Sequence, residues 1–187
     1  MLFRSSAARS EHTATALPGG QVLLVGGTGA NGRPLASAEI FDPDSGTFSA
    51  TGSMSVARTQ HAAALLNDGR VLINGGTDGS ATLASAEIFD PATGQFSSTG
   101  SMLVARRWHT ATTLATGQVL VSGGVRSTDG DVAVPLSNAE LYEPDSGSFA
   151  ATDTGEYAGH RSPASSGGVS HRYARTSLTP DPRMETE

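Results

Sequence analysis

The sequence of 187 residues contains no cysteine and no lysine, and only 5% of its residues are aromatic. Without cysteine, the chain cannot form disulfides, bind zinc through thiolates or attack a substrate with a thiol. All 12 of its basic residues are arginines. It therefore also lacks the lysine needed for a Schiff base or a Walker-type phosphate loop. These absences exclude several large classes of enzyme.

Positive charge and long apolar runs are scarce as well. The net charge of −6 at pH 7 argues against sequence-independent binding of nucleic acid, which needs a basic surface. No stretch approaches the roughly 20 apolar residues of a membrane span, and the start, MLFRSSAARSEH, lacks the apolar segment of a secretory signal. We expect no nucleic-acid partner and no membrane span. The sequence as given predicts a cytoplasmic protein, or a secreted one if an N-terminal part is missing.

Glycine is abundant, with 23 residues, and one phrase occurs three times. HTATALPGGQVLLVGG begins at His12, HAAALLNDGRVLINGG at His61 and HTATTLATGQVLVSGG at His109, so the copies start 49 and 48 residues apart. Self-similarity at a fixed period indicates that one structural unit is stacked. Together with the scarcity of aromatic residues, the glycines favour a turn-rich β-protein over a helical one.

Each copy predicts four short strands. The first is expected at 12–17, 61–66 and 109–114, the third at 36–42, 84–90 and 137–143, and the fourth from Phe48, Phe96 and Phe149. The second is a continuous apolar run, VLLV, VLIN or VLVS, which is typical of a strand covered on both faces. A Gly-Gly pair follows each run and allows close approach of another backbone. Four antiparallel strands in about 50 residues form the pattern of a propeller blade.

Four features recur together: Arg-x-x-His, an apolar run ending in Gly-Gly, an AE-[IL]-[FY]-[DE]-P element, and an aromatic residue six positions after its acid. Over about residues 9–152 this pattern resembles the kelch repeat, and the GSM…AR connectors, 52–58 and 100–106, resemble its bacterial form. The resemblance implies an all-β, kelch-type β-propeller of the galactose-oxidase-like superfamily. It would have three four-stranded antiparallel blades and be partial, since closed propellers have four to eight. The fourth-strand aromatic, Trp in that family, is Phe here.

The pattern also sets the expected domain limits. We expect three repeats at about 9–52, 58–100 and 106–152, within a domain spanning residues 1–155. From Glu156 the sequence has no strand period and many Ser, Arg and Gly residues, so 156–187 is predicted to be a disordered tail. The composition leaves open a genuine tail, a truncated gene and a shifted reading frame.

One polar pair precedes every first strand. The pairs are Arg9 and His12, Arg58 and His61, and Arg106 and His109. In a propeller they would meet on one rim near the axis, where they could bind an acidic or sugar ligand. The alternative, which we favour, is that each pair makes the same structural hydrogen bonds in its own blade. Trp108, the only tryptophan, is a candidate sugar-stacking platform, although we expect a packing role between blades.

Acidic residues give two further candidates. Glu39, Glu87 and Glu140 lie inside apolar third strands, where an unpaired carboxylate would be costly. We expect them to pair with arginine or backbone N–H groups, with general acid catalysis as a remote alternative. Asp129–Asp131 lies in the longest loop between second and third strands but lacks the spacing of an EF-hand, so a solvated loop is favoured over calcium binding. We expect no metal and no cofactor.

These observations predict a non-enzymatic interaction module that binds protein or carbohydrate through the loops of one face. The loops differ most among the copies, and no nucleophile–base or metal constellation is visible. The alternative is a fragment or remnant of a secreted, sugar-acting propeller enzyme resembling galactose or glyoxal oxidase, whose copper site uses a Tyr crosslinked to Cys. The open flanks of the outer blades are expected to promote self-association, with two arcs completing a six-bladed ring.

Overall fold

The computed structural model describes residues 5–127 and 132–152. These belong to the first of two compact units of the chain, Met1–Asp153. The predicted tail, 156–187, and the Asp129–Asp131 loop lie outside the described residues. All secondary structure in the described part is β, which confirms the predicted class. In that part no helix is long and apolar enough to cross a membrane.

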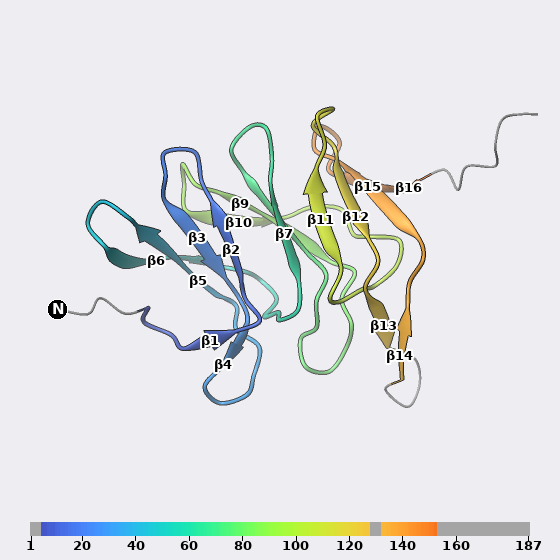
Figure 1. Cartoon of the computed structure of the whole chain (residues 1–187), viewed down its shortest axis with the longest axis horizontal. Helices are drawn as coiled ribbons and strands as arrows, with labels where there is room; N and C mark the ends of the chain where they lie inside the picture. Colours follow the sequence, from blue (N-terminus) through green and yellow to red (C-terminus); the bar gives the residue numbers. More distant parts are fainter. Residues whose placement is uncertain (1–4, 128–131, 153–187) are drawn as a thin grey trace, which may run out of the picture. The chain divides into compact units, whose positions relative to one another are not determined.

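Three four-stranded antiparallel sheets follow one another, one for each repeat (Figure 1). Blade 1 contains β2 (Thr13–Ala16), β3 (Val22–Val25), β5 (Ser37–Asp42) and β6 (Thr47–Ser53). Blade 2 contains β7 (Ala62–Leu65), β8 (Val71–Asn74), β9 (Ala86–Asp90) and β10 (Gln95–Ser98). Blade 3 contains β11 (Thr110–Thr113), β12 (Val119–Ser122), β15 (Ala139–Glu143) and β16 (Ser148–Ala151). Spatial order follows chain order in every blade. The fold is thus the predicted partial propeller, with strands within two residues of their expected positions.

Two short sheets lie at one end of the blades and were not predicted (Figure 1). β1 (Arg9–Ser10) pairs with β4 (Thr28–Gly29), and β13 (Val125–Ser127) pairs with β14 (Ala133–Pro135). The first sheet joins the segment before the first strand of blade 1 to the loop after its second strand. The second sheet is a hairpin within the loop between the second and third strands of blade 3. We call this end of the three blades the loop face. It comprises residues 9–11, 28–36, 58–60, 77–85, 106–108, 125–127 and 132–138.

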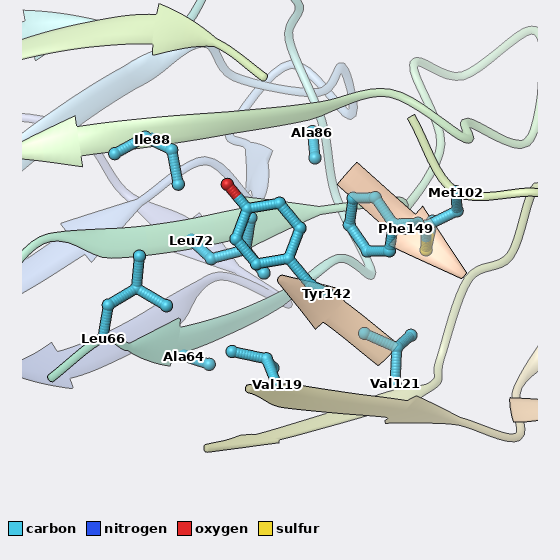
Figure 2. Close-up of a cluster of buried hydrophobic side chains, with 10 residues drawn as sticks. All are labelled: Ala64, Leu66, Leu72, Ala86, Ile88, Met102, Val119, Val121, Tyr142 and Phe149. Atoms are coloured by element: carbon cyan, nitrogen blue, oxygen red, sulfur yellow. The ribbon is translucent and has the colours of Figure 1, made fainter. Parts of the chain in front are cut away.

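The hydrophobic core lies between consecutive blades. One cluster, which includes Leu23, Val71 and Phe89, joins blades 1 and 2. The other joins blades 2 and 3, where Tyr142 lies beside Leu72 (Figure 2). Each connector adds one buried methionine, Met54 to the first cluster and Met102 to the second.

The second strands differ in how far they are covered. All four residues of β8 are buried, as predicted for a strand covered on both faces, but β3 and β12 alternate between buried and half-buried residues. The prediction is therefore right for VLIN and wrong for VLLV and VLVS. The reason is that blade 2 has a neighbour on both sides, whereas blades 1 and 3 each have only one within the described part of the chain.

Candidate functional site

The arginine of each Arg-x-x-His pair lies inside its own blade. Nη1 of Arg58 donates to the carbonyl oxygens of Gly75 and Ser85, both at 3.0 Å, and Nη2 donates to Oε1 of Glu87 at 2.9 Å. The Arg58 side chain is completely buried and that of Glu87 is 3% exposed. This guanidinium therefore joins the ends of the second and third strands and neutralises the buried carboxylate.

The other two blades repeat this arrangement. Arg9 contacts Gly26, Ser37 and Glu39, and Arg106 contacts Gly123, Asn138 and Glu140. The ion pairs measure 3.1 Å and 2.7 Å. Backbone N–H groups complete the site, as where Leu103 and Val104 donate to the Glu140 carboxylate. The predicted pairing of the third-strand glutamates is confirmed, and the geometry favours a structural role for the three arginines over ligand binding.

Glu39 shows how the site holds a buried charge. Burial alone would raise the pKa of this carboxyl group. Hydrogen bonds from Ser5 and Ser6, together with the positive charge of Arg9, outweigh burial and lower the pKa below its ordinary value. The carboxylate is thus stabilised in its charged form.

The histidines join neighbouring blades. Nε2 of His61 lies 2.9 Å from Oγ1 of Thr13 in blade 1, and Nε2 of His109 lies 2.6 Å from Oδ1 of Asn74 in blade 2. Burial, together with the positive charge of the neighbouring arginines, lowers the pKa of His61 to about 3 and that of His109 to about 4. Because an amide oxygen can only accept, Nε2 of His109 carries the proton and Nδ1 is bare. Both side chains are neutral and only 7% exposed at pH 7.

In blades 1 and 2, the first glycine of the Gly-Gly pair lies against the next blade. A Cβ on Gly75 would lie 2.5 Å from the Arg106 carbonyl oxygen and 2.6 Å from Cε1 of His109. The second glycine, Gly76, donates its N–H to that same carbonyl at 2.9 Å. Gly26 is crowded in the same way by Arg58 and His61. The close backbone approach expected at the Gly-Gly pairs is confirmed for the pairs of blades 1 and 2.

This crowding makes Gly75→Ala a destabilising substitution. We expect a loss of about 3 kcal/mol in the free energy of unfolding. About 1 kcal/mol comes from a side chain at φ +64°, and the rest comes from displacing the next blade. Gly32→Ala is the matched control, because Gly32 has φ +74° and a Cβ there would meet nothing within 4 Å. Urea denaturation measures both, and equal losses would contradict the close contact between the blades.

One row of residues on the loop face has an unusual backbone. Glu11, Gln60 and Trp108, at the position just before each histidine, have φ values of 53°, 58° and 56°. The N–H of Trp108 donates to the Gln60 carbonyl at 2.9 Å, and the N–H of Gln60 donates to the Glu11 carbonyl at 3.3 Å. Positive φ in residues other than glycine costs about 1–3 kcal/mol and tends to occur at functional sites. The row crosses all three blades.

Trp108 is the last residue of this row, and its side chain is exposed to solvent. Its side chain is 56% exposed, and Cζ of Arg107 lies 4.9 Å from the centroid of its ring. The expected packing role between blades is therefore wrong: the ring belongs to neither core cluster. Leu103 and Val132 are the other large apolar side chains exposed in the described residues; Val132, like Trp108, comes from the third repeat, and Leu103 comes from the connector before it.

A hollow of about 520 Å³ lies on the same face between blades 2 and 3. Loop residues 80–82 of blade 2 form one side, and Arg126 and Ser127 of blade 3 form another. The connector residues 103–105, with exposed Leu103, complete the lining. A hydrogen bond from Thr82 to Ser127 links the two loops.

The structure thus divides the predicted binding residues into two groups. Arg9, Arg58, His61, Arg106 and His109 make contacts within or between blades, whereas His12 is half-buried and Trp108 is exposed. Glu11, Gln60, Arg107 and the hollow were not predicted as parts of a site. The available signal was a position that varies among Glu, Gln and Trp inside an otherwise repeated motif. Within residues 5–127 and 132–152, no three His, Asp or Glu side chains are grouped so that they could hold a metal ion.

Comparison with known protein families identifies the repeat. The family model described as the Kelch motif matches residues 8–55 and 58–103, which together make up half of the chain. The third repeat lies beyond the matched residues but has the same buried Arg–Glu ion pair. No curated protein matches the sequence.

Proposed function

The chain belongs to the kelch-motif family, and on this premise we propose that it is a non-enzymatic module that binds a protein ligand on its loop face. Kelch motifs form repeat modules that are commonly used for protein interaction. We place the binding surface on the loop face because of Trp108, a large aromatic side chain that is 56% exposed and has a strained backbone. Tryptophan is among the residues that most often dominate the binding energy of protein interfaces.

The surroundings of Trp108 support a peptide segment as the ligand. Exposed Leu103 in the hollow offers an apolar contact, and apolar patches on a surface mark interaction sites. Arg126 in the hollow and Arg107 beside the tryptophan ring provide positive charge. The partner segment should therefore combine an apolar anchor with an acidic group.

A random peptide library displayed against the full chain tests this proposal. We expect selected peptides to contain an aromatic or aliphatic residue near an acidic one. Trp108→Ala should weaken their binding at least about 30-fold, as expected for a central interface tryptophan. Because the ring is exposed, the substitution should leave the melting temperature nearly unchanged. Titration calorimetry gives the affinities.

Asp145→Ala is the matched control for this experiment. Asp145 is exposed in a turn at the opposite end of the blades and lines a separate hollow with Asn67 and Thr116. Its substitution should not change the affinity of the peptides. If the peptides bound the Trp108 variant as tightly as the parent chain, the loop face would not be the binding surface.

Carbohydrate is the second candidate ligand, supported by the row itself. Beyond Trp108, the row offers the side chains of Glu11 and Gln60, which are linked by hydrogen bonds of 3.2 and 3.4 Å. An aromatic face beside polar groups suits sugar binding. A glycan array with the parent chain and Trp108→Ala decides between the two ligands. Turnover in a copper-supplemented galactose oxidase assay would instead support the enzyme-remnant alternative.

A further inference from the structure

Consecutive blades meet through one repeated contact near their first strands. The following blade supplies a histidine ring and the carbonyl of its arginine, and the preceding blade supplies a Gly-Gly pair. The N–H of Gly27 donates to the Arg58 carbonyl, and that of Gly76 donates to the Arg106 carbonyl, both at 2.9 Å. We call the histidine and arginine carbonyl the plug and the glycine pair the socket.

The described chain has one plug and one socket that are not used. Gly123 and Gly124 of blade 3 form a socket, yet a Cβ on Gly123 would meet no atom within 4 Å. Arg9 and His12 form the plug of blade 1, and His12 remains half-buried without a hydrogen bond to any described residue. The unused halves are therefore complementary and lie on opposite blades.

The free face of blade 1 has the residues of a blade interface. Val22, Phe41 and Phe48 are neighbours across the strands, and with Leu24 and Ala14 they line an apolar hollow of about 180 Å³. Their counterparts in blade 2 are Val71, Phe89, Phe96 and Ile73. In blade 2 these side chains pack against blade 1 in the core.

The free face of blade 3 likewise has the residues of a blade interface. Leu120 and Leu141 are paired across β12 and β15 and are half-buried. Their counterparts, Leu72 and Ile88 of blade 2, are buried beneath blade 3 (Figure 2). Blade 3 therefore presents outward the kind of surface that blade 2 presents to its following blade.

A third contact, on the outer strands, follows the same rule. The hydroxyls of Thr51 and Thr99 donate to the carbonyls of Gly94 and Gly147 in the following blade, both at 3.1 Å. Thr152, the corresponding residue of blade 3, donates to Ala139 in its own blade at 3.2 Å. Within the described residues, the plug and apolar face of blade 1 thus have no preceding blade to contact. The socket, apolar face and outer hydroxyl of blade 3 have no following blade to contact.

We propose that a second copy of this chain covers both faces, with blade 3 of each copy packed on blade 1 of the other. The interface would continue the two blade interfaces already present within the chain and would bury no unpaired carboxylate, because Arg9 neutralises Glu39. Two head-to-tail interfaces close the assembly into a six-bladed ring, within the range of known propellers. Closure also protects the apolar faces from open-ended growth.

The mass of the full chain in solution tests the proposal. Light scattering after gel filtration should give twice the chain mass of 19.0 kDa at about 50 µM. Leu24→Glu on one face and Leu141→Glu on the other should each abolish the dimer, since every interface needs both faces. Gly123→Ala should do the same by filling the socket, whereas Gly32→Ala, with a similar φ and open surroundings, should remain dimeric.

Several results would overturn this assembly. A parent chain that stays monomeric at about 50 µM, or one that grows beyond the dimer with concentration, does not form the closed ring. Dissociation by only one of the two glutamate variants would indicate pairing of like faces. Circular dichroism checks folding: because Leu24 and Leu141 are half-buried, the variants should remain folded monomers. Loss of cooperative unfolding in both would show that the chain itself covers these faces.

Discussion

Replacement of Arg58 by methionine should lower the free energy of unfolding by about 3–5 kcal/mol, the usual cost of breaking a buried ion pair by removing one partner. The substitution leaves the Glu87 carboxylate, which is 3% exposed, with only the N–H groups of Ser55 and Val56. It also removes the hydrogen bonds from Nη1 to the carbonyls of Gly75 and Ser85, and of these only the Ser85 carbonyl keeps another donor, the N–H of Gly75. Urea denaturation followed by circular dichroism measures the loss.

The chain contains its own control for this prediction. Arg70 and Asp68 form an ion pair of 2.6 Å whose side chains are 41% and 46% exposed. Exposed pairs contribute about 0–1 kcal/mol, so Arg70→Met should have a small effect. The double substitution of Arg58→Met with Glu87→Leu should recover part of the lost stability, because no charge then remains buried. If Arg58→Met cost no more than Arg70→Met, the ion pair would not hold blade 2 together.

The strands of the blades could be predicted because their signal is both local and repeated. Apolar runs such as VLIN and the turns that end in glycine occur in three copies at nearly constant spacing. β1, β4, β13 and β14 escaped prediction because strands of two or three residues have no readable alternation. Their pairing depends on where the blades place the loops, which no short window of sequence specifies.

The candidate site could be predicted only in part, for a related reason. A carboxylate inside an apolar strand requires a partner, so the pairing of Glu87 with a cation followed from its position. The exposure of Trp108 did not, because this residue has a positive φ of 56°, which the residue type does not indicate. Tryptophan side chains are well buried on average, whereas Trp108 is exposed at this position of the backbone.

Acidification provides the second large effect, because His61 and His109 are buried in their neutral forms. Their pKa values in the folded chain are about 3 and about 4, against an ordinary value of 6.5. Between these values the unfolded chain binds more protons than the folded chain, so stability falls as the pH drops below 6.5. At pH 4.5 each histidine should cost about 2–3 kcal/mol, and the two together about 5 kcal/mol.

The pH window separates this effect from that of the carboxylates. Glu39 has a pKa lowered below its ordinary 4.5, so the stability it contributes is lost only at more acid pH. His109→Gln keeps a donor for Asn74 but removes the titrating group, and it should reduce by about half the slope of unfolding free energy against pH between 6.5 and 4.5. Urea denaturation at intervals of half a pH unit gives this slope. An unchanged slope in the variant would mean that His109 is protonated in the folded chain, and that neutral imidazoles do not join the blades.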